Sequence, residues 1–236
     1  MNSYFFIPLI LQKIIWVPTR IILVVFGRLE VSGLENLYSL PSPVIFACNH
    51  SSEIDPFIVP ASLPFWSRFS PIFYTTKERK FYSQNGWRKY LFGGFFIKMW
   101  GGYTAYTGLR DYQKSLSPHI NVILHGGSFC IFPEGGITKD GNLQSSRGGM
   151  AYLAERAGCS IVPVAISGVY GLSPLDFFLG GFARKHKVRI SFRKAIAQEE
   201  LKNNFPSGSH LGENTYRKKG DYVMERIRGA LLQSAL

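Results

Sequence analysis

Short apolar runs alternate with segments of helical periodicity, and this alternation constrains the fold more than any other feature. The runs cover residues 43–49, 128–133, 159–167 and 187–192, and each has the length and composition of a buried strand. Segments 108–124 and 148–158 fit helices, and Gly158 is a typical helix stop. The pattern predicts an α/β domain with a mixed, partly parallel sheet flanked by helices.

The composition indicates a basic, aromatic-rich globular chain. Its 236 residues are enough to bury a core, and an apolar content of 46% excludes a disordered chain. A net charge of +12 with 15% aromatic residues predicts an anionic partner. Because charged residues make up only 18%, we expect a membrane surface as that partner and no nucleic acid.

The cysteines and histidines give no sign of a disulfide or a metal site. Cys48, Cys130 and Cys159 lie in apolar settings without a C-x-x-C pair, which predicts buried free thiols in a reducing compartment. The five histidines lack metal-ligand spacing, and no glycine-rich phosphate-binding fingerprint occurs. We therefore expect neither a metal nor another cofactor.

Residues 1–27 predict an amphipathic segment that anchors the chain to a membrane. Gln12, Lys13, Thr19 and Arg20 fall within one arc at 100° per residue, and apolar side chains fill the rest. This pattern is typical of a helix that lies in the headgroup plane. Two alternatives stay open: a helix packed on the core of the domain, and a helix that crosses the bilayer. Aromatic and basic residues also alternate in segments 65–100 and 174–187, as they do at membrane interfaces.

Two polar motifs follow predicted strands, where ligands gather in open α/β sheets. In the first, Asn49–Asp55, Asp55 lies five residues after His50. A carboxylate that binds one imidazole nitrogen fixes the tautomer and leaves the other nitrogen to act as a general base. No nucleophile elbow accompanies the pair, so a bound substrate hydroxyl would be the nucleophile. The alternative is a helix N-terminus in which His50 is incidental.

The second motif, Phe132–Gly136, combines a carboxylate with two glycines. Glu134 is a candidate for binding a hydroxyl, and Gly135 lets backbone N–H groups approach a ligand. Lys139 and Arg147 follow within reach of an anionic head group.

Together the motifs resemble the glycerolipid acyltransferase family, whose best-known members are the 1-acylglycerol-3-phosphate acyltransferases. The matching elements are Asn49-His50-x4-Asp55, Phe132-Pro133-Glu134-Gly135 and Val162-Pro163-Val164, and the resemblance extends over residues 28–195. It implies an acyltransferase domain over residues 28–236, in which His50 is the base, Asp55 orients it, and Glu134 and Gly135 help to bind the acceptor. It also implies an acyl thioester of coenzyme A or acyl-carrier protein as co-substrate, and a location at the cytoplasmic face of a membrane.

The chain departs from the family at two positions where arginines that bind phosphate are usual. Thr107 or Gly108 occupies the first, with Arg110 as a candidate substitute, and Ile137 occupies the second. We expect 1-acyl-sn-glycerol-3-phosphate as acceptor, giving phosphatidic acid. The alternatives are another lysolipid, such as a lyso-aminolipid, and a non-catalytic lipid-binding membrane protein.

Overall fold

The computed structural model describes residues 3–78, 95–106, 111–178, 187–206 and 213–235. Arg110, most of the aromatic and basic segment after residue 78, and residues 179–186 lie outside these ranges. Statements about what the structure contains refer to the described residues.

The described residues form one seven-stranded sheet in the order β1-β7-β6-β2-β5-β3-β4. The strands are β1 (Glu30–Ser32), β2 (Ile45–Cys48), β3 (Ile72–Thr76), β4 (Gly102–Thr104), β5 (Ser128–Ile131), β6 (Ile161–Ser167) and β7 (Arg189–Phe192). Neighbouring strands are parallel except β6 and β7, which are antiparallel. The mixed, partly parallel sheet expected from the sequence is therefore confirmed.

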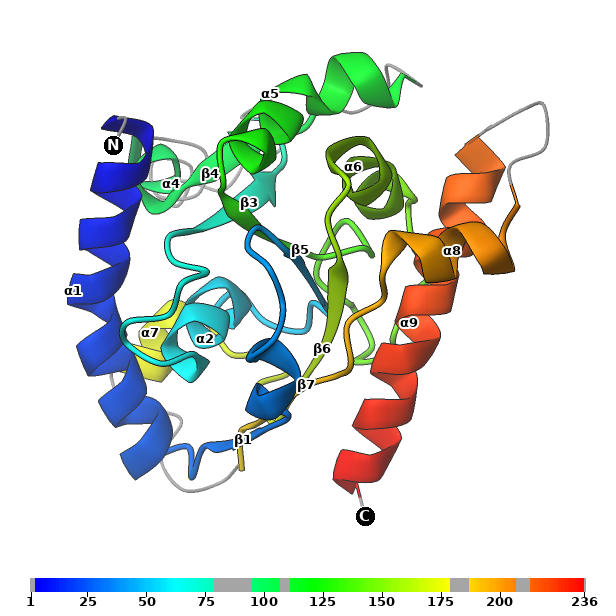
Figure 1. Cartoon of the computed structure of the whole chain (residues 1–236). Coiled ribbons are helices and arrows are strands. Elements are labelled where there is room, and N and C mark those ends of the chain that lie inside the picture. Colours follow the sequence, from blue (N-terminus) through cyan, green and yellow to red (C-terminus); the bar gives the residue numbers. More distant parts are fainter. Residues whose placement is uncertain (1–2, 79–94, 107–110, 179–186, 207–212, 236) are drawn as a thin grey trace.

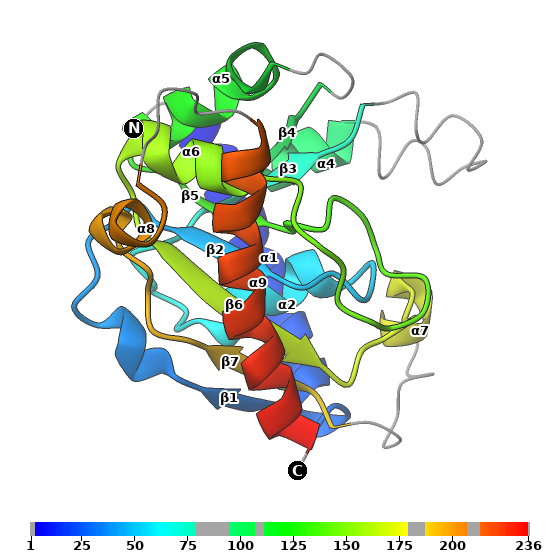
Figure 2. The ribbon, with the colours of Figure 1, turned by 90° about the vertical axis from the view of Figure 1, so that its right-hand side faces the viewer.

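Helices cover both faces of this sheet, so the architecture has three layers (Figure 1). One face carries α1 (Ser3–Val25), α2 (Asp55–Ser62), α4 (Phe95–Trp100) and α7 (Pro174–Phe178), and a short 3₁₀ helix, η1 (Leu34–Leu37), packs on the same side. The other face carries α5 (Tyr112–Leu124), α6 (Gly149–Ala157), α8 (Gln198–Asn204) and α9 (Glu213–Ala235). In Figure 2, α9 runs along the sheet on the side opposite α1.

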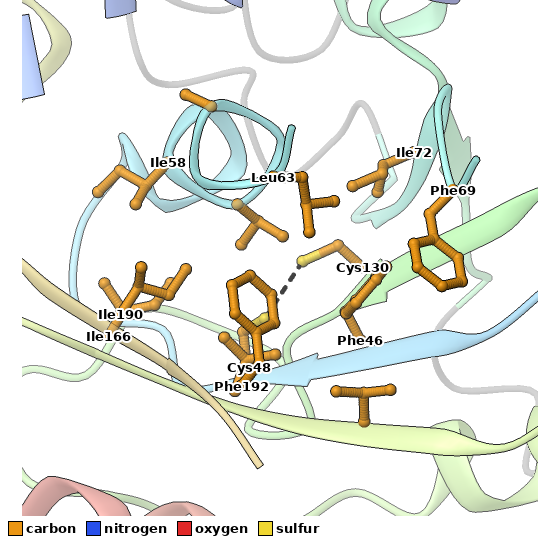
Figure 3. Close-up of a cluster of buried hydrophobic side chains, with 14 of the residues drawn as sticks. Phe46, Cys48, Ile58, Leu63, Phe69, Ile72, Cys130, Ile166, Ile190 and Phe192 are labelled. Atoms are coloured by element: carbon orange, nitrogen blue, oxygen red, sulfur yellow. Dashed lines mark hydrogen bonds between the residues drawn. The ribbon is translucent and has the colours of Figure 1, made fainter. Parts of the chain in front are cut away.

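The central strands are apolar on both faces because both faces are covered. Along β2, Phe46 and Cys48 point to the α2 side, whereas Ile45 and Ala47 point to the α6 side. Figure 3 shows the first of these cores, in which the Sγ atoms of Cys48 and Cys130 lie 3.5 Å apart. All three cysteines are buried free thiols, as predicted.

Helix α1 packs on the domain through polar side chains as well as apolar ones such as Leu23, and it exposes a separate apolar stripe. Gln12, Trp16 and Arg20 follow one another at intervals of four residues, which places them on one helix face. Gln12 Nε2 donates to the carbonyls of Ile72 and Trp100, at 2.7 and 2.9 Å. Trp16 and Arg20 donate to carbonyls at the end of α2. The outward stripe consists of the exposed residues Phe6, Ile7, Ile10, Ile14, Val17, Ile21, Val24 and Val25.

The direction of α1 therefore differs from the sequence-based expectation. The polar arc was expected to face the aqueous headgroup region, but Gln12 and Thr19 are buried against the domain. Buried amides require hydrogen-bond partners, and the carbonyls at the start of β3 and the end of α4 supply them. By length and composition alone, Phe5–Val25 is also apolar enough to cross a membrane.

Candidate active site

The two polar motifs meet at one edge of the sheet. Strands β2 and β5 are parallel neighbours, with Ala47 opposite Ile131, so the loops that follow them leave from the same edge. The backbone N–H of Thr138 donates to the carbonyl of His50 at 2.9 Å, which ties the loops together. Both motifs therefore follow strand ends, as expected, and the structure brings them side by side.

His50 and Asp55 form a hydrogen-bonded pair at this edge. His50 Nδ1 lies 2.9 Å from Asp55 Oδ2. The same carboxylate oxygen accepts the backbone N–H groups of Ser51 and Ser52, at 2.8 and 2.9 Å. Asp55 is fully buried and begins α2, with Pro56 in the first turn. These contacts fix the carboxylate beside the imidazole. Asp55 therefore does more than place a favourable charge at the N-terminus of a helix, which is the alternative interpretation of the motif.

The imidazole of His50 is held in one orientation. Its ring stacks on Phe132, with 3.9 Å between ring centroids and 16° between ring planes. The side chain is 16% exposed. Because Nδ1 is engaged by Asp55, Nε2 is the nitrogen available to a substrate. This arrangement meets the geometric requirement for a general base whose tautomer is set by a carboxylate.

Glu134 joins two loops through its carboxylate. Oε1 accepts the backbone N–H of His50 at 2.8 Å, and Oε2 accepts that of Gln144 at 2.9 Å. Burial raises the pKa of this carboxyl, and the two N–H donors act in the opposite direction. The two hydrogen bonds give Glu134 a positioning role at the site, and the direct contact with the acceptor stays a prediction.

Gly135 supports the side chain of Arg147. Its φ is +73°, and a Cβ at this position would lie 2.4 Å from Arg147 Nε, so only glycine fits. Its own N–H donates to the carbonyl of Phe132 at 3.0 Å and is therefore engaged within the loop. A role of this loop in binding the acceptor stays a prediction. Arg147 Nε donates to the carbonyl of Glu134 at 3.1 Å. Arg147 therefore lies at the motif loop, as the sequence indicated.

Lys77 is a second cation at this edge that the sequence analysis did not single out. It directly follows β3, the neighbour of β5. A Cβ on Gly136 would lie 3.0 Å from Lys77 Nζ. Burial, and secondarily the positive charge of Arg147, lowers the pKa of Lys77. In the sequence, the feature that could have indicated a role for Lys77 is its position at the end of a strand. Only the strand order shows that this strand end lies beside the motif loop.

The remaining residues that the sequence singled out lie on the surface, directly after β2, or outside the described residues. Lys139 is exposed on the loop after Gly136, where its carbonyl accepts the hydroxyl of Tyr170 at 2.7 Å. Ile137 is also exposed, and Arg110 lies outside the described residues. Asn49 exchanges two hydrogen bonds with the backbone of Ile166, so it fixes β2 to β6, the strand that contains the Val162–Val164 motif.

Comparison with known proteins shows the family of this chain. The acyltransferase family model matches residues 28–167, a range that includes both motif loops. The chain belongs to the acyltransferase family. The 1-acyl-sn-glycerol-3-phosphate acyltransferase LPAT1 (chloroplastic) of Arabidopsis thaliana is 27% identical over 172 residues, which cover 72% of this chain and 44% of that protein. The chloroplastic BAT2 of Brassica napus, with the same activity name, is 26% identical over 72% of this chain and 46% of its own length.

A solved structure shares the fold of this chain. The 1-acyl-sn-glycerophosphate acyltransferase PlsC of Thermotoga maritima superposes with a TM-score of 0.60 at 19% identity, covering 94% of this chain and 79% of that chain. The chain spans less than half the length of the curated relatives named above. The matched family region ends at residue 167, before β7, α8 and α9.

Proposed function

We propose that this protein transfers an acyl group from a thioester to the free hydroxyl of a lysolipid, with 1-acyl-sn-glycerol-3-phosphate as acceptor and phosphatidic acid as product. The observation that carries the proposal is the His50–Asp55 pair beside two cations, Lys77 and Arg147. The pair supplies a base for a hydroxyl, and the cations supply counter-charges for a phosphate. Membership of the acyltransferase family and the names of the two plant relatives support the same reaction.

The reaction follows from the free nitrogen of His50. Nε2 accepts the proton of the acceptor hydroxyl as its oxygen attacks the thioester carbonyl. Asp55 stabilises the imidazolium that forms. The tetrahedral intermediate then collapses, the carbon–sulfur bond breaks, and the proton on Nε2 passes to the leaving thiolate. The new ester and the free thiol leave His50 neutral again, and the chemistry requires no metal or other cofactor.

The phosphate of the acceptor would bind Lys77 and Arg147. A phosphate monoester carries nearly two negative charges and is bound best by several charged donors. The two cations approach each other from β3 and from the segment before α6, and an anion between them would relieve their mutual repulsion. They would take over the part of the arginines that are absent at residues 107–108 and 137. The thioester of coenzyme A or acyl-carrier protein would be the co-substrate.

The membrane would hold the lipid substrate, and α1 is the anchor that we propose. Its polar face is bonded to the domain at Gln12, Trp16 and Arg20, and its outward stripe is apolar. A helix fixed along the domain in this way is suited to lie in the membrane surface. The plant relatives are named as chloroplastic; for this chain, we propose the cytoplasmic face of a membrane.

Acyl transfer by the purified protein tests the reaction. In detergent, with both thioester carriers and a panel of lysolipids, the wild-type protein should acylate lysophosphatidate. His50→Ala should reduce kcat by about 10²- to 10⁴-fold, the usual contribution of a general base, and should leave the thermal unfolding midpoint unchanged. An active His50→Ala variant would refute the assignment of the base. Asp55→Asn should reduce kcat by a similar factor.

Competition between acceptors tests the phosphate site. Lys77→Ala and Arg147→Ala should each raise the KM for lysophosphatidate by about 10- to 100-fold, because a charged hydrogen bond contributes about 1.5–3 kcal/mol. The KM for the thioester should not change, and Lys202→Ala, at an exposed lysine of α8, is the control. A preference for a zwitterionic lysolipid that neither variant alters would exclude lysophosphatidate as acceptor and favour the alternative lysolipids. Lysolipid binding without any turnover would indicate the non-catalytic alternative.

A further inference from the structure

The segment that carries Arg147 is held by a helix outside the matched family region. Helix α9 begins at Glu213, and its first half lies against residues 146–148. Asp221 Oδ1 accepts the backbone N–H of Ser146 at 2.7 Å. The hydrogen bond joins residues 75 positions apart, so it fixes this segment in a way that local sequence does not.

The contact between α9 and this segment is close. A Cβ on Gly220 would lie 2.1 Å from Ser146 Oγ, and a Cβ on Gly148 would lie 3.0 Å from the backbone nitrogen of Arg217. Side chains at either glycine would therefore push the segment away. Ser146 Oγ itself accepts the N–H of Gly148 at 3.1 Å. Helix and segment thus fit with little free space between them.

The same segment holds Arg147 from its other sides. The N–H of Arg147 donates to the carbonyl of Pro133 at 2.9 Å. Its carbonyl accepts the hydroxyl of Tyr112, on α5, at 2.7 Å. Asp221 fixes the N–H of Ser146, one peptide unit before those that flank the Arg147 Cα. The two helices therefore hold the chain just before Arg147 and at its own carbonyl. The guanidinium is then placed over Gly135 and beside Lys77.

We propose that Asp221 is a positioning residue for acceptor binding. It acts through the backbone of Ser146, which helps to hold Arg147 over Gly135 and on the same side as Lys77. The proposal rests on the proposed function of the Lys77 and Arg147 pair. It assigns to α9, which lies beyond the residues matched by the family model, a part in head-group recognition. A side-chain carboxylate on a distant helix, which accepts the backbone N–H of Ser146, thus helps to keep Arg147 in place by a tertiary contact.

Steady-state kinetics of the full chain test this role. Asp221→Ala should raise the KM for lysophosphatidate by about five- to tenfold, the loss expected for one hydrogen bond, with kcat and the thioester KM unchanged. Asp221→Asn retains an oxygen that can accept the Ser146 N–H, so it should behave as wild type. Glu225→Ala is the matched control, because Glu225 lies one turn further along α9 and its exposed carboxylate binds Arg228 at 2.9 Å. Equal effects of Asp221→Asn and Asp221→Ala would overturn the proposal.

A double-mutant cycle and hydrogen exchange separate this proposal from the reaction itself. In an Arg147→Ala background, Asp221→Ala should have no further effect on the acceptor KM, whereas additive effects would show that Asp221 acts elsewhere. Amide exchange of the peptide containing Ser146 should be at least about tenfold faster in Asp221→Ala than in wild type. Unchanged exchange would overturn the proposal even if no acyl transfer is found. Fast exchange without any wild-type turnover would instead refute the proposed function alone.

Discussion

At the scale of single residues, the dyad could be predicted from the sequence because it is local. His50 and Asp55 are five positions apart, and one turn at the start of α2 brings them together. The roles of Glu134 and Gly135 could not be predicted, because their partners belong to other loops: Gln144 for the carboxylate and Arg147 for the glycine. Lys77 was missed for the same reason, since only the strand order places it at the site.

The two hydrogen bonds of Glu134 lead to a prediction that separates positioning from substrate binding. Glu134→Gln replaces one carboxylate oxygen by an NH₂ group, which cannot accept a hydrogen bond. The remaining oxygen can accept the N–H of His50 or that of Gln144, so one of the two loses its partner. We expect this variant to lose about 1–3 kcal/mol of stability, the cost of a buried donor left unpaired, and to lower kcat while the acceptor KM stays near the wild-type value. Chemical denaturation and steady-state kinetics measure both. If the variant instead raised the acceptor KM alone, without a loss of stability, the result would support a direct contact between Glu134 and the acceptor.

At the scale of elements, α1 shows what periodicity can and cannot establish. The pattern of polar residues correctly predicts an amphipathic helix, but not the surface that each face meets. The orientation of α1 depends on carbonyls at the start of β3 and the ends of α2 and α4, which accept its polar side chains. These carbonyls come together only when the domain folds. The membrane-anchoring role of residues 1–27 stays a prediction. Because Leu23 and Gln12 are buried, point substitutions test it better than deletion of the helix.

Gln12 provides a test of how α1 is attached. Its amide makes three hydrogen bonds, two as donor and one as acceptor from the N–H of Ile72. Gln12→Ala should destabilise the protein by about 2–4 kcal/mol, because the buried backbone groups lose their partners. Ile14→Ala, two residues further on and 64% exposed, should change stability by less than about 0.5 kcal/mol. Denaturant unfolding in detergent measures both, and equal losses would show that α1 is not docked in this way.

Helix α5 contains a histidine that should make stability depend on pH. Burial lowers the pKa of His119 from its ordinary 6.5 to about 4. The unfolded chain therefore binds a proton below pH 6.5 that the folded chain does not, so this group favours folding above pH 6.5 and ceases to do so as the pH falls towards 4. At about 1.4 kcal/mol per pKa unit, the loss amounts to about 3 kcal/mol.

Substitution of His119 should remove this part of the pH dependence. His119→Gln can still donate to the carbonyl of Tyr103, the partner of Nε2 at 3.2 Å, but it does not titrate. The variant should show a flatter stability profile between pH 6.5 and 4 in urea titrations. His125→Gln, at an exposed histidine that caps the same helix, should retain the wild-type profile. An unchanged slope in His119→Gln would assign the acid sensitivity to other groups.

At the scale of the whole molecule, the sequence predicted the class of fold but not its topology. The four expected strands correspond to β2, β5, β6 and β7, and the two expected helices to α5 and α6. Strands β1, β3 and β4 were not identified, since β1 and β4 have three residues each and lack a clear apolar run. The order of strands could not be predicted either. It depends on which apolar faces pack together, as in the two cores on either side of β2.

The three layers give the molecule two chemically different sides, and this asymmetry should determine how it binds a membrane. The outward stripe of α1 lies on one side of the sheet, and α5 and α9 lie on the other (Figure 1). Ile14→Asp combined with Ile21→Asp should abolish flotation with phospholipid vesicles, because each charge would have to enter the apolar interface. The matched control is Leu124→Asp with Leu232→Asp. These leucines are as exposed as Ile14, at 66% and 65% against 64%, but they lie on α5 and α9, so flotation should be retained.

Raising the salt from about 0.1 M to about 1 M shortens the screening length from about 10 to about 3 Å. Higher salt should weaken binding only in part, since apolar contacts are not screened. Equal losses in both double variants would mean that the net charge of +12, and not the α1 stripe, directs the protein to the membrane.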